Sequence, residues 1–386
     1  MKFPFRSHTK KLIEAEREAI KKSIGEVIDN GSYHAYNGHV EVIRFEAALS
    51  DFFKNPVVAV NSGTDALILA LHILNIGEED EVIVPAFSFI STASVVPWIG
   101  ATPVFVDINE TDFAINPKEI EQKITPRTKA IIVAHLFGHP ATGIEHVMDI
   151  AKKRNLYVIE DAAQSFGARI LLRTEKSPAQ QKILGTIGDI GCFSFSSTKT
   201  FSAPGNGGAL IIKNPQLYIR GKEMRSYGMN DDNEYVIPGV NNIMHDVQAA
   251  ALTAKLRFQK HWLSQRTRVA RYYTENLTGI GDLILPKGSS ESESIYYRYV
   301  IRTKSRDGLF EYLKKSLPPH KHLQPSKNYP TPLPHLPLFK YLHYNHGEFP
   351  VSEQVSSEVL SLPISNTVTV RDAALICSVV RSFFAA

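Results

Sequence analysis

Between about residues 56 and 215, short runs of apolar and often β-branched residues alternate with longer amphipathic segments. This alternation is typical of an α/β domain built on a mostly parallel sheet. Because the runs are apolar throughout, we expect helices on both faces of the sheet, with Asp65–Ile76 and Ile144–Arg154 among them. The seven predicted strands are Val57–Val60, Glu81–Val84, Pro103–Val106, Ala130–Val133, Tyr157–Ile159, Cys192–Phe195 and Gly208–Ile212.

The pattern changes after about residue 243. A long helical stretch from Asp246 to about Asn276 leads into a loop at Pro286–Ser294. We then expect a strand at Tyr297–Arg302, a helix at Asp307–Leu317 and a Pro- and His-rich loop at Pro318–Pro337. The sequence therefore predicts two domains: residues 1–245, and a linking helix with a smaller α/β domain in residues 246–386.

The composition excludes several classes of protein. Of the 386 residues, 43% are hydrophobic and 21% charged, which is far from a disordered or low-complexity chain. The 43 basic and 39 acidic side chains are scattered along the chain, so we expect no nucleic-acid partner. With only Cys192 and Cys377, neither a disulfide-rich secreted framework nor a Cys-x-x-Cys metal site can form. We find no leader-like or membrane-spanning apolar run, and expect a cytoplasmic protein without membrane contact.

Polar residues follow several strands at the sheet edge where open α/β folds bind ligands. Asn61–Thr64 opens the helix after the first strand, so its backbone N–H groups could bind an anion, although a simple Ser/Thr N-cap explains it equally well. Glu160–Asp161 ends the fifth strand, where a carboxylate can partner a cation or a protonated ring nitrogen. Ser194 and Lys199 follow before the glycine cluster Gly205–Gly208, and a confined lysine can act as an amine nucleophile.

These residues form an ordered set: an anion-binding turn, an aromatic residue (Phe89), an acid (Asp161), a hydroxyl (Ser194) and a lysine (Lys199). In this set the chain resembles the fold-type I pyridoxal-phosphate enzymes, and specifically the DegT/DnrJ/EryC1/StrS family of nucleotide-sugar aminotransferases. The resemblance implies a large domain with a mostly parallel seven-stranded sheet covered by helices, and a smaller C-terminal α/β domain. Its most specific segments are Ser62–Leu67, Pro85–Phe89, Gly100–Asp107, Glu160–Ala168 and Phe193–Lys199.

The resemblance also implies a role for each site residue. Lys199 forms the internal aldimine with pyridoxal phosphate (PLP) and, once released, moves the proton between the substrate carbon and the cofactor. Asp161 pairs with the protonated pyridine nitrogen. Asn241 matches a position that reaches the phosphate of the neighbouring subunit, so the active unit is expected to be a homodimer with shared sites. The other implied cofactor contacts are Ser62, Gly63, Thr64 and Ser194 at the phosphate, Phe89 stacked on the ring, and Gln164 near the 3-hydroxyl. Taken alone, Phe89 would be interpreted as a core aromatic residue.

The implied reaction transfers an amino group from an amino acid, L-glutamate by family resemblance, to a keto group of a nucleotide-linked deoxysugar through a pyridoxamine phosphate (PMP) intermediate. Three alternatives stay open: a PLP-binding regulatory protein without turnover, another fold-type I enzyme such as an amino-acid aminotransferase or a desulfurase, and the sugar dehydratase branch. Lys199 and the two cysteines argue against a dehydratase, because that branch replaces the lysine by histidine or adds an iron–sulfur cluster.

The chain departs from the family pattern at positions that bear on sugar recognition. Many relatives carry Arg at Ile243, Asp at Asn206, Gln at His139 and His-Tyr-Pro at Asn328–Pro330. The segment Leu171–Ile183 is longer than the usual connection, and we interpret it as a surface insertion rather than a lid.

No metal site is predicted. His135 and His139 have no acidic or cysteine partner clustered near them in the sequence. The histidines of the late loops are expected to be solvated or to face the substrate; they are His320, His322, His335, His343 and His346.

Overall fold

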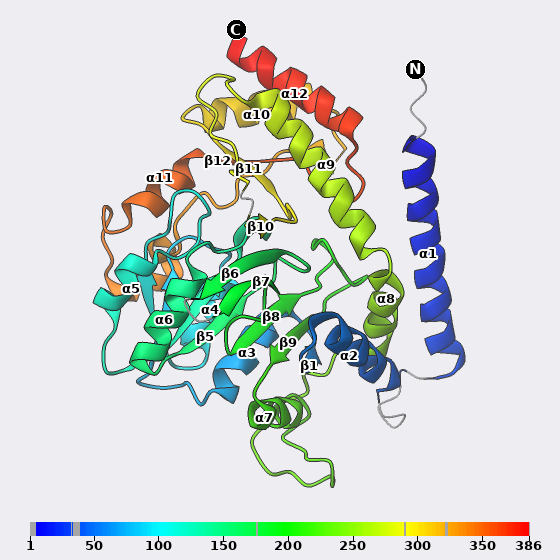
Figure 1. Ribbon diagram of the computed structural model, residues 1–386, viewed down its shortest axis with the longest axis vertical. Coiled ribbons are helices and arrows are strands. Elements are labelled where there is room, and N and C mark those ends of the chain that lie inside the picture. Colours follow the sequence, from blue (N-terminus) through cyan, green and yellow to red (C-terminus); the bar gives the residue numbers. More distant parts are fainter. Residues whose placement is uncertain are drawn as a thin grey trace.

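The computed structural model describes residues 5–31, 33, 39–174, 177–288, 291–320 and 323–385. At its centre is a seven-stranded sheet in the order β1-β9-β8-β5-β4-β2-β3 (Figure 1). All neighbouring pairs are parallel except those of β9, which runs antiparallel to both β1 and β8. The seven predicted strands are all confirmed, as β1 (Val57–Val60), β2 (Glu81–Pro85), β3 (Thr102–Val106), β4 (Thr128–Ala134), β5 (Tyr157–Asp161), β8 (Ile190–Ser194) and β9 (Gly208–Ile212).

Helices cover both faces of this sheet, as the apolar strands predicted. Val58 and Val60 of β1 pack in one hydrophobic cluster with α3 and α4, whereas Val57 and Ala59 face the opposite side and pack with α2. The helix α3 begins two residues before its predicted start. The covering helices are α2 (Val40–Phe53), α3 (Gly63–Ile73), α4 (Ser91–Trp98), α5 (Pro117–Lys123), α6 (Ile144–Arg154) and α7 (Pro215–Arg225).

The single long helix predicted from Asp246 to about Asn276 is wrong. The chain forms two helices, α8 (Asp246–Leu256) and α9 (Gln259–Leu277). The apolar side of α8 packs with α2 in the large core, and α1 (Phe5–Asp29) runs alongside it (Figure 1), whereas α9 packs in a separate cluster through residues such as Tyr273. The two helices bury their apolar sides in different cores, so the chain must change direction between them. No glycine or proline marks the break in the sequence.

The C-terminal region is built around a two-stranded sheet. The antiparallel strands β11 (Tyr299–Arg302) and β12 (Val359–Leu362) share a core with α9, α10 (Arg306–Ser316) and α12 (Val370–Ala385). The remaining elements, η4 (Leu333–His335), η5 (Pro337–Leu342) and α11 (Pro350–Glu358), adjoin the large domain: Phe339 and Phe349 pack on Phe105 of β3. The domain boundary at residues 245–246 stays a prediction.

The longer connection at Leu171–Ile183 forms a β-hairpin. Strands β6 (Arg169–Thr174) and β7 (Ser177–Ile183) pair antiparallel, and β10 (Ser292–Glu293) extends them into a small sheet. The predicted loop Pro286–Ser294 therefore contains a short strand. Because the hairpin pairs with β10, it is fastened to the rest of the chain, which agrees better with a surface insertion than with a free lid.

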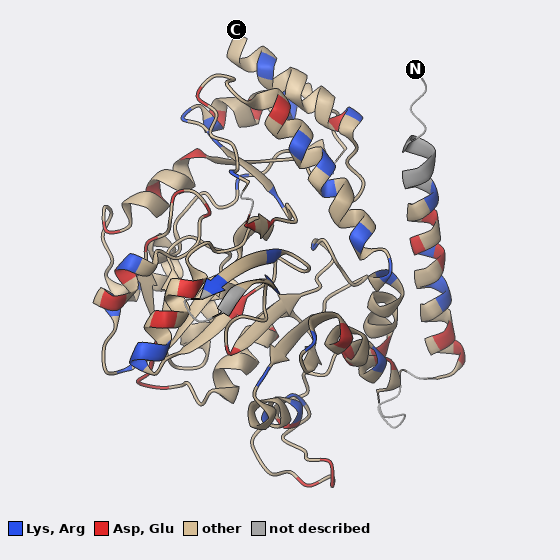
Figure 2. Cartoon of the chain, in the orientation of Figure 1, with Lys and Arg blue, Asp and Glu red and all other residues tan. Residues whose placement is uncertain are grey.

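Acidic and basic side chains are interspersed over the elements rather than gathered by sign (Figure 2). None of the helices in the described part of the chain is both long and apolar enough to cross a membrane.

Candidate active site

The first part of the site lies where β1 and β8 end beside β9. Val60 and Ser194 both pair with Gly208, so the turn after β1 lies next to the end of β8. A Cβ atom added to Gly63 would lie 2.6 Å from the Cβ of Ser194, which shows how closely the two segments pack. The structure therefore brings the predicted phosphate residues Ser62, Gly63, Thr64 and Ser194 together.

Ser62 is also the N-cap of α3. Its Oγ accepts a hydrogen bond from the backbone N–H of Asp65 at 3.0 Å and donates to Oδ2 of the same residue at 2.7 Å. The hydroxyl of Thr64 lies 3.0 Å from that of Ser91, the first residue of α4. The beginnings of α3 and α4 thus adjoin, and both helices direct the positive ends of their dipoles to this region.

Asp161 ends β5 in the middle of the sheet and is buried. Its Oδ2 accepts a hydrogen bond from Oγ1 of Thr92 at 2.7 Å, and its Oδ1 accepts one from the backbone N–H of Ala163 at 3.2 Å. The hydroxyl of Ser88 lies 2.7 Å from that of Thr92. The carboxylate is therefore oriented by a buried hydroxyl chain that the sequence analysis missed.

Lys199 lies between two aromatic rings. Its Nζ is 5.9 Å from the ring centroid of Phe89 and 4.9 Å from that of Tyr297. Phe89 is 45% exposed, so its ring is available for stacking and the core interpretation is wrong for it. Burial raises the pKa of Tyr297, but the charges of Lys199 and Arg298 and hydrogen bonds with Thr198 and Arg298 outweigh burial, so this pKa is lower than usual. Tyr297 was not among the predicted site residues.

Gln164 connects Phe137, which follows β4, with Tyr329 of the late loop. Its Oε1 accepts a hydrogen bond from the backbone N–H of Phe137 at 2.8 Å, and its Nε2 donates to the hydroxyl of Tyr329 at 3.2 Å. Tyr329 belongs to the late loop that resembles the family's substrate loop, and its ring centroid is 6.0 Å from that of Phe89. The two halves of the chain thus meet at the site.

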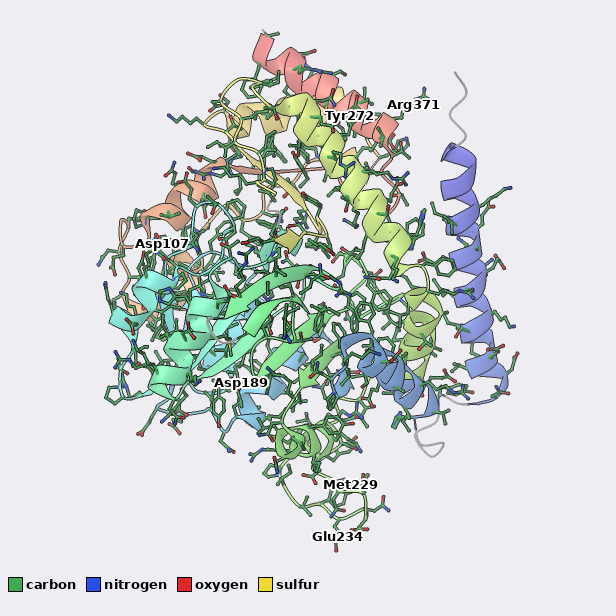
Figure 3. All side chains as sticks on the ribbon, in the orientation of Figure 1. Asp107, Asp189, Met229, Glu234, Tyr272 and Arg371 are labelled. Carbon is green, nitrogen blue, oxygen red and sulfur yellow. The ribbon has the colours of Figure 1, made fainter. Side chains whose placement is uncertain are left out.

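Asn241 and its neighbour are placed differently. Asn241 is exposed, in a segment between α7 and α8 that extends from the body of the protein, with Met229 and Glu234 near its tip (Figure 3). Asn242 is buried, and its Oδ1 accepts a hydrogen bond from the backbone N–H of Asn61 at 3.2 Å. Asn242 therefore supports the turn of its own chain, whereas the described contacts do not join Asn241 to the other eight predicted residues.

The expectation that no acid lies near His135 is wrong. The pairing of β4 with β5 brings Glu160 to it, and His135 Nε2 lies 2.8 Å from Glu160 Oε2, with both side chains fully buried. Because His135 Nδ1 accepts from the backbone N–H of Ala141, we infer that Nε2 carries the proton. Burial raises the pKa of Glu160, but the hydrogen bond from His135 and backbone donors including Gly185 and Gly188 outweigh burial and lower the pKa.

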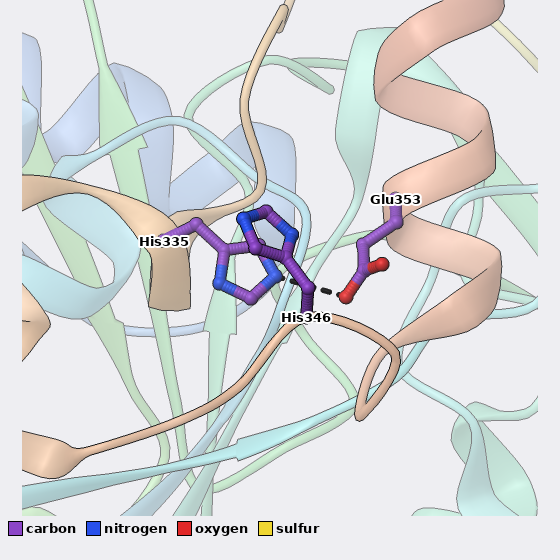
Figure 4. Close-up of side chains that lie close together, drawn as sticks. All are labelled: His335, His346 and Glu353. Atoms are coloured by element: carbon purple, nitrogen blue, oxygen red, sulfur yellow. Dashed lines mark hydrogen bonds and ion pairs between the residues drawn. The ribbon is translucent and has the colours of Figure 1, made fainter.

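The expectation of a solvated or substrate-facing side chain is also wrong for His335. Its side chain is nearly buried, and its Nε2 lies 2.9 Å from Oε1 of Glu353 on α11, with the ring of His346 beside it at an angle of 33° (Figure 4). One possible ligand atom from each of these three residues lies within 4.8 Å of the others. Glu353 also accepts the backbone N–H of Gly347, so it fastens this loop to α11. Of the other predicted histidines, His343 and His346 are exposed, and His322 lies outside the described residues.

The residues at the sheet edge fit PLP. An exposed aromatic ring (Phe89), a buried carboxylate (Asp161) and a primary amine (Lys199) lie around one region, and the glycine turn at Gly63 leaves space beside Ser194 where a side chain would clash. These groups match the ring face, the ring nitrogen, the aldehyde and the phosphate of the cofactor.

The whole chain is similar to known aminotransferases. The DegT/DnrJ/EryC1/StrS aminotransferase family model matches residues 14–381. The UDP-N-acetyl-3-dehydro-alpha-D-glucosamine 3-aminotransferase of Acidithiobacillus ferrooxidans is 35% identical over 365 residues, 95% of this chain and 94% of that protein. The structure of S. venezuelae DesV with a ketimine intermediate has a TM-score of 0.88 and 31% identity, covering 98% of this chain and 97% of that one. NtdA from Bacillus subtilis with bound cofactor PMP has a TM-score of 0.83 and 27% identity, covering 96% and 82%. The chain therefore belongs to the DegT/DnrJ/EryC1/StrS aminotransferase family.

Proposed function

We propose that this protein is a PLP-dependent aminotransferase that moves an amino group from L-glutamate to a keto group of a nucleotide-linked deoxysugar. The observation that carries the proposal is the position of Lys199 Nζ beside the exposed ring of Phe89, at the sheet edge where Asp161 is held by Thr92. The substrate class rests on relatives such as the UDP-N-acetyl-3-dehydro-alpha-D-glucosamine 3-aminotransferase of Acidithiobacillus ferrooxidans.

Different residues of the site would hold different parts of the cofactor. The turn Ser62–Thr64 and Ser194 would bind the phosphate through backbone N–H groups and hydroxyls, and Asp161 would hold the proton on the ring nitrogen. Phe89 would stack on the ring, and Gln164 would lie near the 3-hydroxyl. When bound, PLP supplies an electron sink for the substrate carbon and carries the amino group between the two substrates.

Lys199 is proposed as the base that moves the proton. Its Nζ must lose and regain a proton at each half of the reaction, which requires a surrounding that tolerates the neutral amine. The rings of Phe89 and Tyr297 flank Nζ, and the Arg298 guanidinium contacts the same Tyr297 ring, so the amine is confined between aromatic side chains where it would meet the bound substrate.

The protein is further proposed to work as a homodimer. The segment that carries Asn241 extends from the body and exposes apolar side chains, among them Tyr235 (75% exposed) and Val240. A second copy would cover this surface and receive Asn241 at its phosphate turn. A cytoplasmic location fits this assignment because the two cysteines are free and buried.

The visible absorption spectrum of the PLP-loaded protein tests the proposal. The bound cofactor is expected to give an absorption band that disappears on addition of L-glutamate and returns when a nucleotide ketosugar is added. The Lys199→Ala variant should retain its fold by circular dichroism but lose turnover by at least a thousandfold, because it lacks both the anchoring amine and the base.

Three outcomes would count against it. No cofactor band in the wild-type protein would overturn the cofactor assignment. A band that no amino acid discharges would favour a regulatory protein that binds PLP without turnover. Full turnover by Lys199→Ala would exclude the role assigned to that lysine.

A further inference from the structure

Arg298 is held firmly beside the proposed site. Its backbone N–H donates to the carbonyl oxygen of Phe137 at 3.2 Å, and its Nη1 donates to the hydroxyl of Ser326 at 3.1 Å. Its Cζ lies 5.2 Å from the ring centroid of Tyr297. The Ser326 hydroxyl donates in turn to Oδ1 of Asn328, so the guanidinium is tied to the late loop as well as to the sheet side of the site.

The guanidinium shares its surroundings with the proposed catalytic lysine. The Tyr297 ring that Arg298 contacts is the same ring that lies 4.9 Å from Lys199 Nζ. The charge of Arg298 also acts on Tyr329, whose hydroxyl accepts the hydrogen bond from Gln164. Arg298 is thus within the reach of a small molecule whose reacting atom is at Lys199.

Within the described part of the chain, the positive charge of Arg298 has no counter-ion. No described carboxylate forms an ion pair with Arg298. By contrast, the buried Arg225 pairs with Glu46, and the buried Arg302 pairs with Glu110 and Glu358. Such pairing is usual for a fully buried guanidinium, whereas Arg298 is half-buried.

A second guanidinium increases the excess of positive charge. Arg266 is buried next to this segment and donates to the carbonyl oxygens of Tyr296 and Tyr297 and to Asn366. Burial, with a contribution from the charge of Arg298, lowers the pKa of Arg266 to about 10. Two neighbouring guanidinium groups without a carboxylate between them form an environment that favours an incoming anion.

We propose that Arg298 is the anion-binding residue of the substrate site and receives a carboxylate or phosphate group of a substrate. This inference rests on the proposed function, because it assigns the substrate subsite next to Lys199. The planar guanidinium has five donors: Nη1 donates to Ser326 and the group also bonds the Tyr297 hydroxyl, whereas Nε has no partner among the described residues, so donors remain for hydrogen bonds to an oxyanion. The anion has two possible sources: the carboxylate of the amino donor, and the diphosphate of the nucleotide sugar.

Ligand binding by Arg298 variants tests this assignment. The probes are glutarate, a dicarboxylate without an amino group, and the nucleotides UDP and dTDP, each titrated by calorimetry into the cofactor-loaded protein. The Arg298→Gln variant should bind at least one probe class about ten- to a hundredfold more weakly, because a charge-assisted pair is lost. The Arg298→Lys variant should recover part of the affinity, since it keeps the charge without the planar fork. Arg381→Gln, on the exposed side of α12, is the matched control and should bind like the wild type.

The outcomes show which substrate supplies the anion that Arg298 binds. Weaker binding of glutarate alone, with a raised KM for L-glutamate, assigns Arg298 to the donor carboxylate. Weaker binding of the nucleotides alone assigns it to the diphosphate, and weaker binding of both assigns it to a subsite that the two substrates share. Unchanged binding of all probes, or a wild-type protein that binds none of them, overturns the proposal.

The same experiment distinguishes this proposal from the proposed function. If L-glutamate leaves the cofactor band of the wild type unchanged while glutarate binding still depends on Arg298, the anion subsite stands and transamination fails. If the band responds normally in the wild type and in Arg298→Gln, and binding is also unchanged, transamination stands and the subsite fails.

Discussion

Thr92 donates a 2.7 Å hydrogen bond from its Oγ1 to Oδ2 of Asp161, and both residues are buried. Thr92 lies in the first turn of α4, whereas Asp161 ends β5 in the middle of the sheet. The helix that begins next to the phosphate turn thus also orients the carboxylate proposed to hold the ring nitrogen. Thr92 acts through Asp161 and is a positioning residue.

Replacement of Thr92 by Val tests this role. Valine keeps the shape of threonine but removes the donor, so the Asp161 carboxylate loses a charge-assisted hydrogen bond and the orientation that it provides. We expect PLP to bind about tenfold more weakly, as measured by spectrophotometric titration of the cofactor-free protein. The Thr92→Ser variant keeps the hydroxyl and should restore most of the affinity. Equal cofactor affinity of the Val variant and the wild type would contradict the positioning role.

His139 predicts a pH dependence of stability. Burial lowers its pKa from 6.5 to about 4, with partial opposition from Asp112. As the pH falls below 6.5, the unfolded chain binds a proton at His139 while the folded chain does not. The stability of the folded protein therefore has its full value above pH 6.5, and part of it is lost as the pH falls from 6.5 to 4. The contribution of His139 changes the free energy of unfolding by at most about 1.4 kcal/mol per pH unit.

The His139→Gln variant isolates this contribution. Glutamine can keep a hydrogen bond to the hydroxyl of Ser294, which lies 2.9 Å from His139 Nδ1, but it does not titrate. Unfolding by denaturant at several pH values should show the wild type losing stability relative to the variant as pH falls from 6.5 to 4. A difference between the two proteins that is constant with pH would show that His139 titrates normally.

The buried pair of Glu46 and Arg225 is expected to contribute strongly to stability. Oε1 of Glu46 accepts hydrogen bonds from Arg225 and from the backbone N–H of Ala59, and so connects α2, β1 and the end of α7. Glu46→Gln leaves the guanidinium without a counter-ion and should lower the free energy of unfolding by about 3 kcal/mol. Glu26→Gln breaks only an exposed pair with Lys22 and should change it by less than about 0.5 kcal/mol. Similar values for the two variants, measured by denaturant unfolding, would refute the assignment.

The elements that the sequence predicted well are those whose patterns are local. A buried parallel strand is a continuous apolar run, so all seven strands of the large sheet could be located, and the helix α3 was predicted with a start two residues too late. The break between α8 and α9 could not be predicted in this way, because it arises where the apolar side of the chain leaves one core and enters another.

In the candidate site, too, residues in local motifs could be predicted and residues placed by distant contacts could not. Lys199, Asp161 and the phosphate turn were found because they lie in ordered motifs, and the structure brings them to one sheet edge. Thr92, Tyr297 and Arg298 reach the site through contacts between distant segments, and their residue types are common elsewhere. The pairing of His135 with Glu160 was missed for the same reason, since the two residues meet only because β4 lies beside β5.

Complementation between two inactive variants tests the shared site. If Asn241 serves the phosphate turn of the neighbouring subunit, a heterodimer of Lys199→Ala and Asn241→Ala chains contains one site with Lys199 from one chain and Asn241 from the other, and one site that lacks both. An equal mixture that exchanges subunits freely forms heterodimers in about half of its dimers, so about a quarter of the wild-type activity should return. Each variant alone should stay inactive or strongly impaired, and mixing Lys199→Ala with Asp161→Ala should restore nothing, because both residues serve the site of their own chain. Absence of recovery despite heterodimers detected by native mass spectrometry would place Asn241 in its own subunit's site.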